Sequence, residues 1–143
     1  MKLTLKTTLT IVVIIFSGFS SFGQNIVTSN GDTIANISNL GIITNDSNQI
    51  IGEITSSGEI KNAQGQQIGS IDGNDFKDNT NSLIATQNTI SNEEIEVLNS
   101  SNNILIKVRF GHMVFNSDNS ILFNASEPMS DKYLIAYYLF FIN

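Results

Sequence analysis

Apolar and polar residues follow one another along most of this chain in short runs, and clusters of polar residues separate the runs. Runs such as 51–54 and 68–71 combine isoleucine with Gly, Ser or Glu, and each follows a cluster of Asn, Ser, Asp, Gln or Gly. β-Branched residues fit a pleated strand, whereas Asn, Ser and Gly fit turns. The pattern therefore predicts β-hairpins with a polar turn at each tip.

The predicted hairpins repeat about every 16–17 residues in the first half of the chain. Their turns begin at Ser29, Asn45, Asn62, Asp78, Asn99 and Asn116, and the fourth copy is weaker. Further turn points lie between the units, at Leu40-Gly41, Ser57-Gly58, Asp72-Gly73-Asn74 and Phe110-Gly111. A lone hairpin is marginally stable in water, so the units must pack their isoleucine faces together. We predict an all-β domain of tandem antiparallel β-hairpin repeats arranged radially, which leaves few exposed edges. A parallel β-solenoid is the alternative, but two turn points per unit favour chain reversal.

The C-terminal segment differs from the repeats because both of its alternating faces are apolar. Residues 133–142 include three Tyr, two Phe and no charged side chain. A strand that is apolar on both faces is normally buried on both faces. We therefore predict an apolar C-terminal strand that closes the ring of hairpins, and we expect Tyr138→Asp to unfold the protein. The alternative is the terminal sorting strand of a membrane barrel.

The N-terminus has the features of a secretory signal peptide. Lys2 and Lys6 precede a short apolar run at 9–16, and small residues lead to Gly23. We predict a signal peptide over 1–23 and a single hairpin-repeat domain over 24–143, exported to the periplasm or the extracellular space. The apolar run is shorter than the roughly 20 residues of a spanning helix, although an uncleaved anchor is the alternative. Without cysteine the chain forms no disulfide.

The repeats and the C-terminal segment together resemble the bacterial 5-fold beta-flower proteins. The matching residues are Asn62 to Ile71, the looser copy from Asn45 to Ile54, and the aromatic ending at 136–141. The resemblance covers roughly residue 25 to the end and implies a radial set of hairpins with no established activity. The chain departs from the pattern after Gly73, where the units lack the Ile-Gly pair. Its six predicted turns also exceed a five-fold set, so the last turn is assigned to the closing strand.

The charge of the chain limits its partners. The formal net charge is −6, and no basic cluster is available to neutralise phosphates. The composition thus disfavours binding to nucleic acid and to anionic lipid. We expect no cofactor, no membrane span in the mature protein, an unknown envelope or extracellular partner, and a monomer or weak homo-oligomer.

No residue pattern in the chain predicts catalysis or metal binding. His112 is the only histidine, and no Gly-x-Ser-x-Gly motif accompanies it, so we interpret it as an ordinary partly buried or surface residue next to Gly111 at the start of a strand. The acidic cluster at 72–78 lacks the spacing and the later Glu of a calcium loop and is interpreted as a turn. The acids at 93–96 are interpreted as a solvated face or protected edge. We assign no catalytic, cofactor-binding or metal residue and predict that the protein is not an enzyme.

Two functional hypotheses follow from the sequence. The first is a non-catalytic exported structural or interaction module that uses its polar hairpin tips as the contact surface. The second is a small-ligand or glycan-binding protein of the cell envelope whose site lies in the divergent half, Glu93 to Phe123. Phe110, Phe115 and Phe123 lie in that half, although burial in the core is the expected role of phenylalanines on alternating strands.

Overall fold

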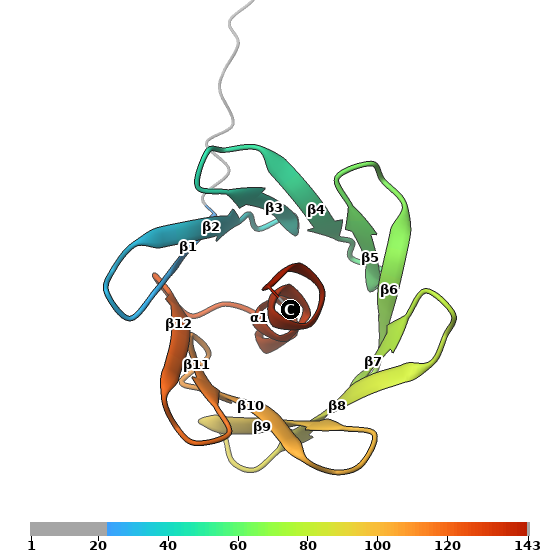
Figure 1. The fold of residues 1–143 in the computed structure, drawn as a ribbon, viewed down its shortest axis with the longest axis vertical. Coiled ribbons are helices and arrows are strands. Elements are labelled where there is room, and N and C mark those ends of the chain that lie inside the picture. Colours follow the sequence, from blue (N-terminus) through green and yellow to red (C-terminus); the bar gives the residue numbers. More distant parts are fainter. Residues whose placement is uncertain (1–22, 143) are drawn as a thin grey trace, which may run out of the picture.

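The computed structural model describes residues 23–142, in which the chain forms one closed antiparallel barrel around a central helix. Neighbouring strands in the sequence are neighbours in the sheet, and β12 pairs with β1 to close the ring (Figure 1). The strands are β1 (Gln24–Val27), β2 (Thr33–Ile37), β3 (Ile42–Asn45), β4 (Ile50–Ile54), β5 (Glu59–Asn62), β6 (Gln67–Asp72), β7 (Asp75–Asp78), β8 (Leu83–Thr89), β9 (Glu94–Asn99), β10 (Ile104–Arg109), β11 (Met113–Asn116) and β12 (Ile121–Ala125). Apart from Gly23, the predicted signal peptide lies outside the described residues.

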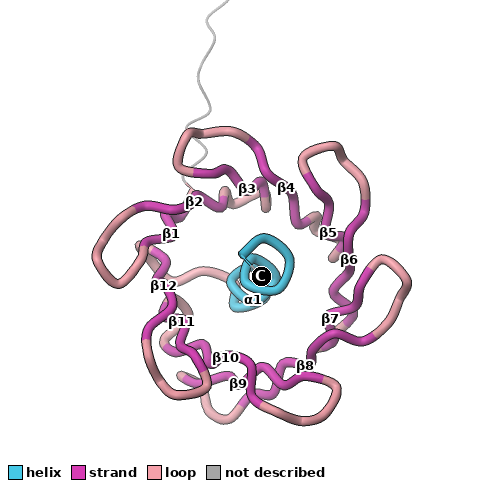
Figure 2. Tube along the Cα trace, viewed as in Figure 1, coloured by secondary structure: helices cyan, strands magenta, loops and turns pink. Residues whose placement is uncertain are grey.

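The strands form six hairpins whose loops point outward around the ring (Figure 2). The outer turns lie between β1 and β2, and likewise within each later pair, where the polar clusters predict them. The predicted radial antiparallel arrangement is therefore confirmed, and the solenoid alternative is wrong. The assignment of the last turn to a closing strand is also wrong. β11 and β12 form a sixth hairpin that pairs with β10 on one side and β1 on the other.

One hydrogen-bonding pattern recurs at the hairpin tips. In the third hairpin the Asn62 side-chain oxygen accepts the backbone N–H groups of Gln64 and Gln66, at 3.0 Å each. The Asn62 backbone oxygen accepts the N–H of Gly65, whose φ is positive. Asn tolerates positive φ better than most residues, and Gly adopts it freely. The tips therefore repeat in structure because Asn, Asp or Thr begins the turn and Gly or Asn occupies the left-handed position, as at Asn48.

The core lies between the inner face of the barrel and α1 (Asp131–Tyr137), which continues as the π-helical turn η1 (Tyr138–Ile142). Figure 1 shows both elements in the middle of the ring, with the C-terminus at its centre. Leu134, Ile135 and Ala136 have no exposed surface. The fully buried inward-facing strand residues include Ile26, Ala35, Ile37, Ile43, Ile60, Phe76, Ala85, Val97, Ile106 and Val114.

The predicted C-terminal strand is wrong in conformation, although its central position is confirmed. Every strand of the closed ring already pairs on both sides, so the interior offers no strand edge. Buried backbone N–H and C=O groups need partners, and a helix supplies them from its own chain. A helix that is apolar all round is likewise expected in a buried position. The apolar pattern at 133–142 therefore indicates burial correctly, but the closed ring decides the conformation.

Two glycines on the barrel wall make room for aromatic rings of η1. A Cβ atom on Gly52 would overlap the ring of Phe141, and a Cβ atom on Gly69 would overlap the ring of Phe140. Opposite these glycines, Tyr137 packs edge-on against Phe123, with ring centroids 5.6 Å apart. The Ile-Gly pairs of the second and third hairpins thus have a packing role, because they set how closely the wall approaches the helix.

Candidate functional site

Two adjoining cavities lie at the end of the barrel where the chain crosses inward to begin α1. The first, of about 360 Å³, lies against the turn between β2 and β3. The second, of about 280 Å³, lies against the turn between β4 and β5. Ser130 and Tyr133 line both cavities, so the two spaces meet at the first turn of α1. The lining also includes Gln24, Ser38, Asn39, Pro128 and Met129 in the first cavity, and Ile54, Thr55, Ser56, Ser57, Gly58, Ile71 and Lys132 in the second.

The two turns beside these cavities have the same local construction. Each begins with a hydroxyl residue and ends with a glycine of positive φ, as Ser38 to Gly41 and Thr55 to Gly58. The Ser38 hydroxyl accepts the N–H of Ile42, and the Thr55 hydroxyl accepts the N–H four residues later, at 3.0 Å in both cases. Local side-chain bonds of this kind fix a turn without a longer loop. The cavity walls are therefore held by the turns themselves.

A third, smaller cavity, of about 110 Å³, lies at the same end and is acidic. Glu93, Glu94 and Asp131 line it together with apolar residues such as Val108. Burial raises the pKa of the Asp131 carboxyl above its ordinary value of 3.8. Within residues 23–142, no group of three or more His, Cys, Asp or Glu side chains is arranged to hold a metal ion. Glu93, Glu94 and Asp131 of the third cavity are thus not among groups arranged to hold a metal ion.

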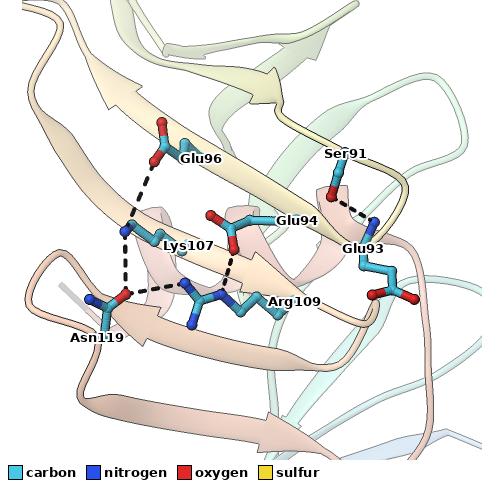
Figure 3. A network of polar contacts seen from close by, with 7 residues as sticks. All are labelled: Ser91, Glu93, Glu94, Glu96, Lys107, Arg109 and Asn119. Carbon is cyan, nitrogen blue, oxygen red and sulfur yellow. Dashed lines mark hydrogen bonds and ion pairs between the residues drawn. The ribbon is translucent and has the colours of Figure 1, made fainter.

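The divergent half contains a network of polar contacts on the outer face of the barrel (Figure 3). Arg109 donates to Glu94 at 2.7 Å and to Asn119 at 3.2 Å, and its guanidinium lies 4.9 Å from the centre of the Phe115 ring. Lys107 donates to Asn119 at 3.3 Å and lies 4.0 Å from Glu96. These side chains satisfy one another across β9, β10 and the 117–120 turn, so the network joins neighbouring strands.

The acids at 93–96 do not share one role. Glu94 and Glu96 pair with the basic side chains of β10, whereas the Glu93 backbone N–H donates to the Ser91 hydroxyl at 3.2 Å (Figure 3). Because β9 pairs on both sides, the interpretation of these acids as protection of a strand edge is wrong. Cross-strand pairing of opposite charges describes Glu94 and Glu96 better.

The aromatic residues of the divergent half divide between core and surface. Phe115 and Phe123 are buried, whereas Phe110 is 52% exposed and occupies a left-handed turn position beside Gly111. His112 lies in the same turn, and its Nδ1 atom is 2.7 Å from the Phe110 carbonyl oxygen. No aromatic platform beside a roomy cavity is formed here, so the structure gives little support to a glycan site between Glu93 and Phe123.

The acidic cluster at 72–78 contains the predicted turn between two hairpins at residues 73–74, and its three acids lie on the flanking strands β6 and β7, where their carboxylates serve different contacts. Asp72 pairs with Lys77 at 2.7 Å, and the hydrogen bond and charge of Lys77 lower the pKa of Asp72. Asp75 accepts the Thr86 hydroxyl at 2.9 Å. Asp78 accepts the hydroxyl of Thr80 and the backbone N–H groups of Thr80 and Ser82, and these bonds lower the pKa of Asp78. The cluster therefore stabilises two turns.

A family model described as "5-fold beta-flower protein" matches residues 23–142, which include all twelve strands and the central helix. The chain belongs to the 5-fold beta-flower family. The expected resemblance is thereby confirmed over the whole described region. No curated protein and no solved structure matches this beta-flower chain.

The beta-flower protein described here has six hairpins, one more than the five-fold symmetry in the family's description. The ring closes only through β11 and β12, since β1 pairs with β12. Neither helical segment within residues 23–142 has the length and apolar character of a membrane-spanning helix.

Sequence reasoning missed the cavity residues around the start of α1. The apolar pattern at 133–142 places Tyr133 in a strand and gives Ser130 and Lys132 no role. A usable signal was present, because Ser38-Asn39-Leu40-Gly41 and Thr55-Ser56-Ser57-Gly58 share a hydroxyl-x-x-Gly pattern 17 residues apart. This repeat marks the turns that join one hairpin to the next. These turns lie at the end of the hairpins opposite the Asn-rich tips.

Proposed function

We propose that this beta-flower protein is an exported, non-catalytic interaction module whose hairpin tips contact a partner in the periplasm or outside the cell. The observation that carries the proposal is the uniform construction of the six outer turns. Each presents a left-handed residue at the same place, namely Gly31, Asn48, Gly65, Asn81, Asn102 and Asn119. Polar loops on a rigid scaffold commonly carry binding function.

The commitment of polar side chains to structural contacts supports a non-catalytic role. A general base or nucleophile must lie within hydrogen-bond reach of its partner and of the substrate. Glu94 and Glu96 instead pair with the basic side chains of β10 (Figure 3), and His112 contacts a backbone carbonyl. The carboxylates of Asp78 and Asp118 accept hydrogen bonds inside their own turns.

The charged and apolar pattern before Gln24 supports export, since it has the order of a secretory signal. The test is expression of the full chain in a bacterium, with cell fractionation and mass measurement of the product. We expect the mass of a chain that begins at Gln24, in the periplasm or medium. A matched variant with Lys2 and Lys6 changed to Glu should accumulate unprocessed. Retention of the uncleaved full chain in the cytoplasm would contradict export.

The contact role of the tips is tested by photo-crosslinking in the native host. A photoreactive residue replaces Ser47 or Ser101, which are exposed at two tips, and a control replaces Asn88, which is exposed away from them. We expect the same discrete crosslinked species from both tips and none from the control. Products that are equal at all three positions, or absent at both tips, would contradict a tip-mediated interaction.

Small-ligand binding is the second candidate function. The observation that favours it is the pair of cavities that meet at Tyr133, whose combined size falls within the range of about 300–1,000 Å³ common for small-molecule sites. This places the candidate site away from the Glu93 to Phe123 half.

A further inference from the structure

We propose that the two cavities around Tyr133 bind a short acidic saccharide, with one sugar ring in each cavity. The two cavities and the residues that line them form one site, the Tyr133 site. This proposal develops the ligand-binding candidate and is independent of the tip contacts, which lie at the other ends of the hairpins.

The chemistry of the Tyr133 site differs from that of the whole chain. The chain contains 13 acidic residues, yet no carboxylate lines either cavity. The lining offers hydroxyl and amide groups, which both donate and accept hydrogen bonds as sugar hydroxyls require. Lys132 supplies the single positive charge, and no ion pair among the described residues involves it. A negatively charged molecule would thus meet a local cation in an otherwise acidic protein.

Several polar groups of the Tyr133 site have no partner within residues 23–142. Ser130 precedes α1 without a side-chain capping bond. The side chains of Asn39, Ser56, Lys132 and Tyr133 also form no hydrogen bond with the described chain, unlike Ser38 and Thr55, which brace their turns. Asn39 lines the first cavity, Ser56 and Lys132 line the second, and Ser130 and Tyr133 line both, so each cavity has polar groups that are free to bind a ligand.

Tyr133 provides the apolar surface that a sugar ring needs. It is half-buried, packs against the core cluster and lines both cavities. An aromatic side chain of this kind combines an apolar ring with a polar hydroxyl. Since Tyr133 lines both cavities, a ligand that fills them contacts this residue from both sides. This arrangement favours two linked sugar rings over a single one.

Other ligand classes fit the Tyr133 site less well. An apolar ligand would leave the hydroxyl and amide groups without hydrogen bonds, which is costly when they are buried. A multiply charged phosphate compound would need several cations, whereas Lys132 is alone. A peptide that binds by strand addition would need an unpaired strand edge, and the closed ring of described strands has none. A saccharide with one carboxylate matches the polar lining and the single lysine, with the acidic ring beside Lys132.

The test is calorimetric titration of the purified protein with cellobiouronate, which has one carboxylate, as the acidic probe and cellobiose as the otherwise identical neutral probe. We expect saturable binding of cellobiouronate and binding of cellobiose that is about tenfold weaker, because Lys132 adds a charge-assisted hydrogen bond. Lys132→Gln should remove this preference, whereas Lys61→Gln on the outer face should leave both affinities unchanged. Tyr133→Phe should weaken both probes and retain the melting temperature to within a few degrees.

Several outcomes would overturn the proposal. One is the absence of saturable binding of cellobiouronate to a protein that melts cooperatively. Others are equal affinity for both probes, or an equal loss of affinity in Lys132→Gln and Lys61→Gln. If Tyr133→Phe fails to fold, Asn39→Ala provides the second test, because Asn39 is exposed and lines the first cavity. Unchanged affinity in Asn39→Ala would then contradict the site. None of these results depends on tip crosslinking, so the two proposals fail separately.

Discussion

Replacement of Gly52 by alanine tests whether the wall glycines position the central helix. The added Cβ atom would overlap the ring of Phe141 and would also lie 2.6 Å from the carbonyl oxygen of Lys61 on β5. Insertion of a methyl group into a well-packed core typically costs about 1–3 kcal/mol. For a domain of this size, each kcal/mol corresponds to about 4 °C in melting temperature. We therefore expect Gly52→Ala to melt about 4–12 °C lower than the unaltered protein.

A double-mutant cycle separates the aromatic contact from the backbone contact. Phe141→Leu removes the ring that meets the added methyl group but leaves the Lys61 carbonyl in place. We expect Phe141→Leu to recover part of the stability lost in Gly52→Ala, with a coupling energy of about 0.5–3 kcal/mol. Urea unfolding monitored by circular dichroism measures each free energy of unfolding.

Gly65→Asn is the matched control for the cycle. Nothing lies within 4 Å of a Cβ atom at Gly65, and asparagine occupies the corresponding left-handed position in four other hairpins. We expect this change to be nearly neutral. The packing argument is refuted if Gly52→Ala is as stable as the unaltered protein, or if its effect and that of Phe141→Leu are simply additive.

Four further changes test other parts of the structure by urea or thermal unfolding. Ile135→Asp should abolish the cooperative unfolding transition, because it buries an unpaired charge. Tyr138→Asp should only lower the unfolding midpoint, since Tyr138 is partly exposed. An unchanged midpoint in Ile135→Asp would contradict the central helix. Asn62→Ala should lower the free energy of unfolding by about 1 kcal/mol, because it removes the acceptor of two backbone N–H groups. Asn62→Asp keeps an acceptor and should lower it less. Equal losses in the two variants would refute the role of the Asn62 side chain in holding the turn. Arg109→Lys should lower the free energy of unfolding by about 1 kcal/mol in low salt, because lysine lacks the planar guanidinium that contacts Glu94, Asn119 and the Phe115 ring. An unchanged unfolding midpoint would contradict this role. Burial raises the pKa of Asp131, so the contribution of its protonated carboxyl to the free energy of unfolding is fully present below the unfolded pKa of 3.8 and is lost as the pH rises through the folded pKa. Asp131→Asn should therefore raise the melting temperature at pH 7 but not below pH 3.8. A difference in melting temperature that does not depend on pH would refute the assignment.

The outer turns could be predicted from the sequence because their causes are local. Asn45 and Asn62 hold their turns through bonds to residues two and four positions later, so the pattern is readable within five residues. The inner turns at Gly41 and Gly58 were likewise indicated by glycines that adopt positive φ. Local chemistry of this kind survives in any arrangement of the hairpins.

The central helix and the Tyr133 site could not be predicted in the same way because their causes are distant in the sequence. Aromatic and β-branched residues at 133–142 favour a strand by intrinsic propensity, and only closure of β1 on β12 removes the strand partner. Ser130 and Asn39 share a cavity although 91 residues separate them. The periodicity of the sequence does not indicate that the turn at 38–41 lies beside the segment at 128–130 that leads into α1.

The divergence of the later hairpins has a geometric cause. A helix advances by 3.6 residues per turn, so it cannot present six equivalent faces to six equivalent hairpins. The buried residues at the corresponding wall position of the six hairpins are Ala35, Gly52, Gly69, Ala85, Ile106 and Phe123. Small residues face the rings of Phe140 and Phe141, and the large Phe123 meets the edge of Tyr137. Identical repeats would leave cavities on one side or overlaps on the other. The departure from the Ile-Gly pattern after Gly73 therefore follows from wrapping a symmetric ring around an asymmetric helix, and it does not by itself mark a binding site.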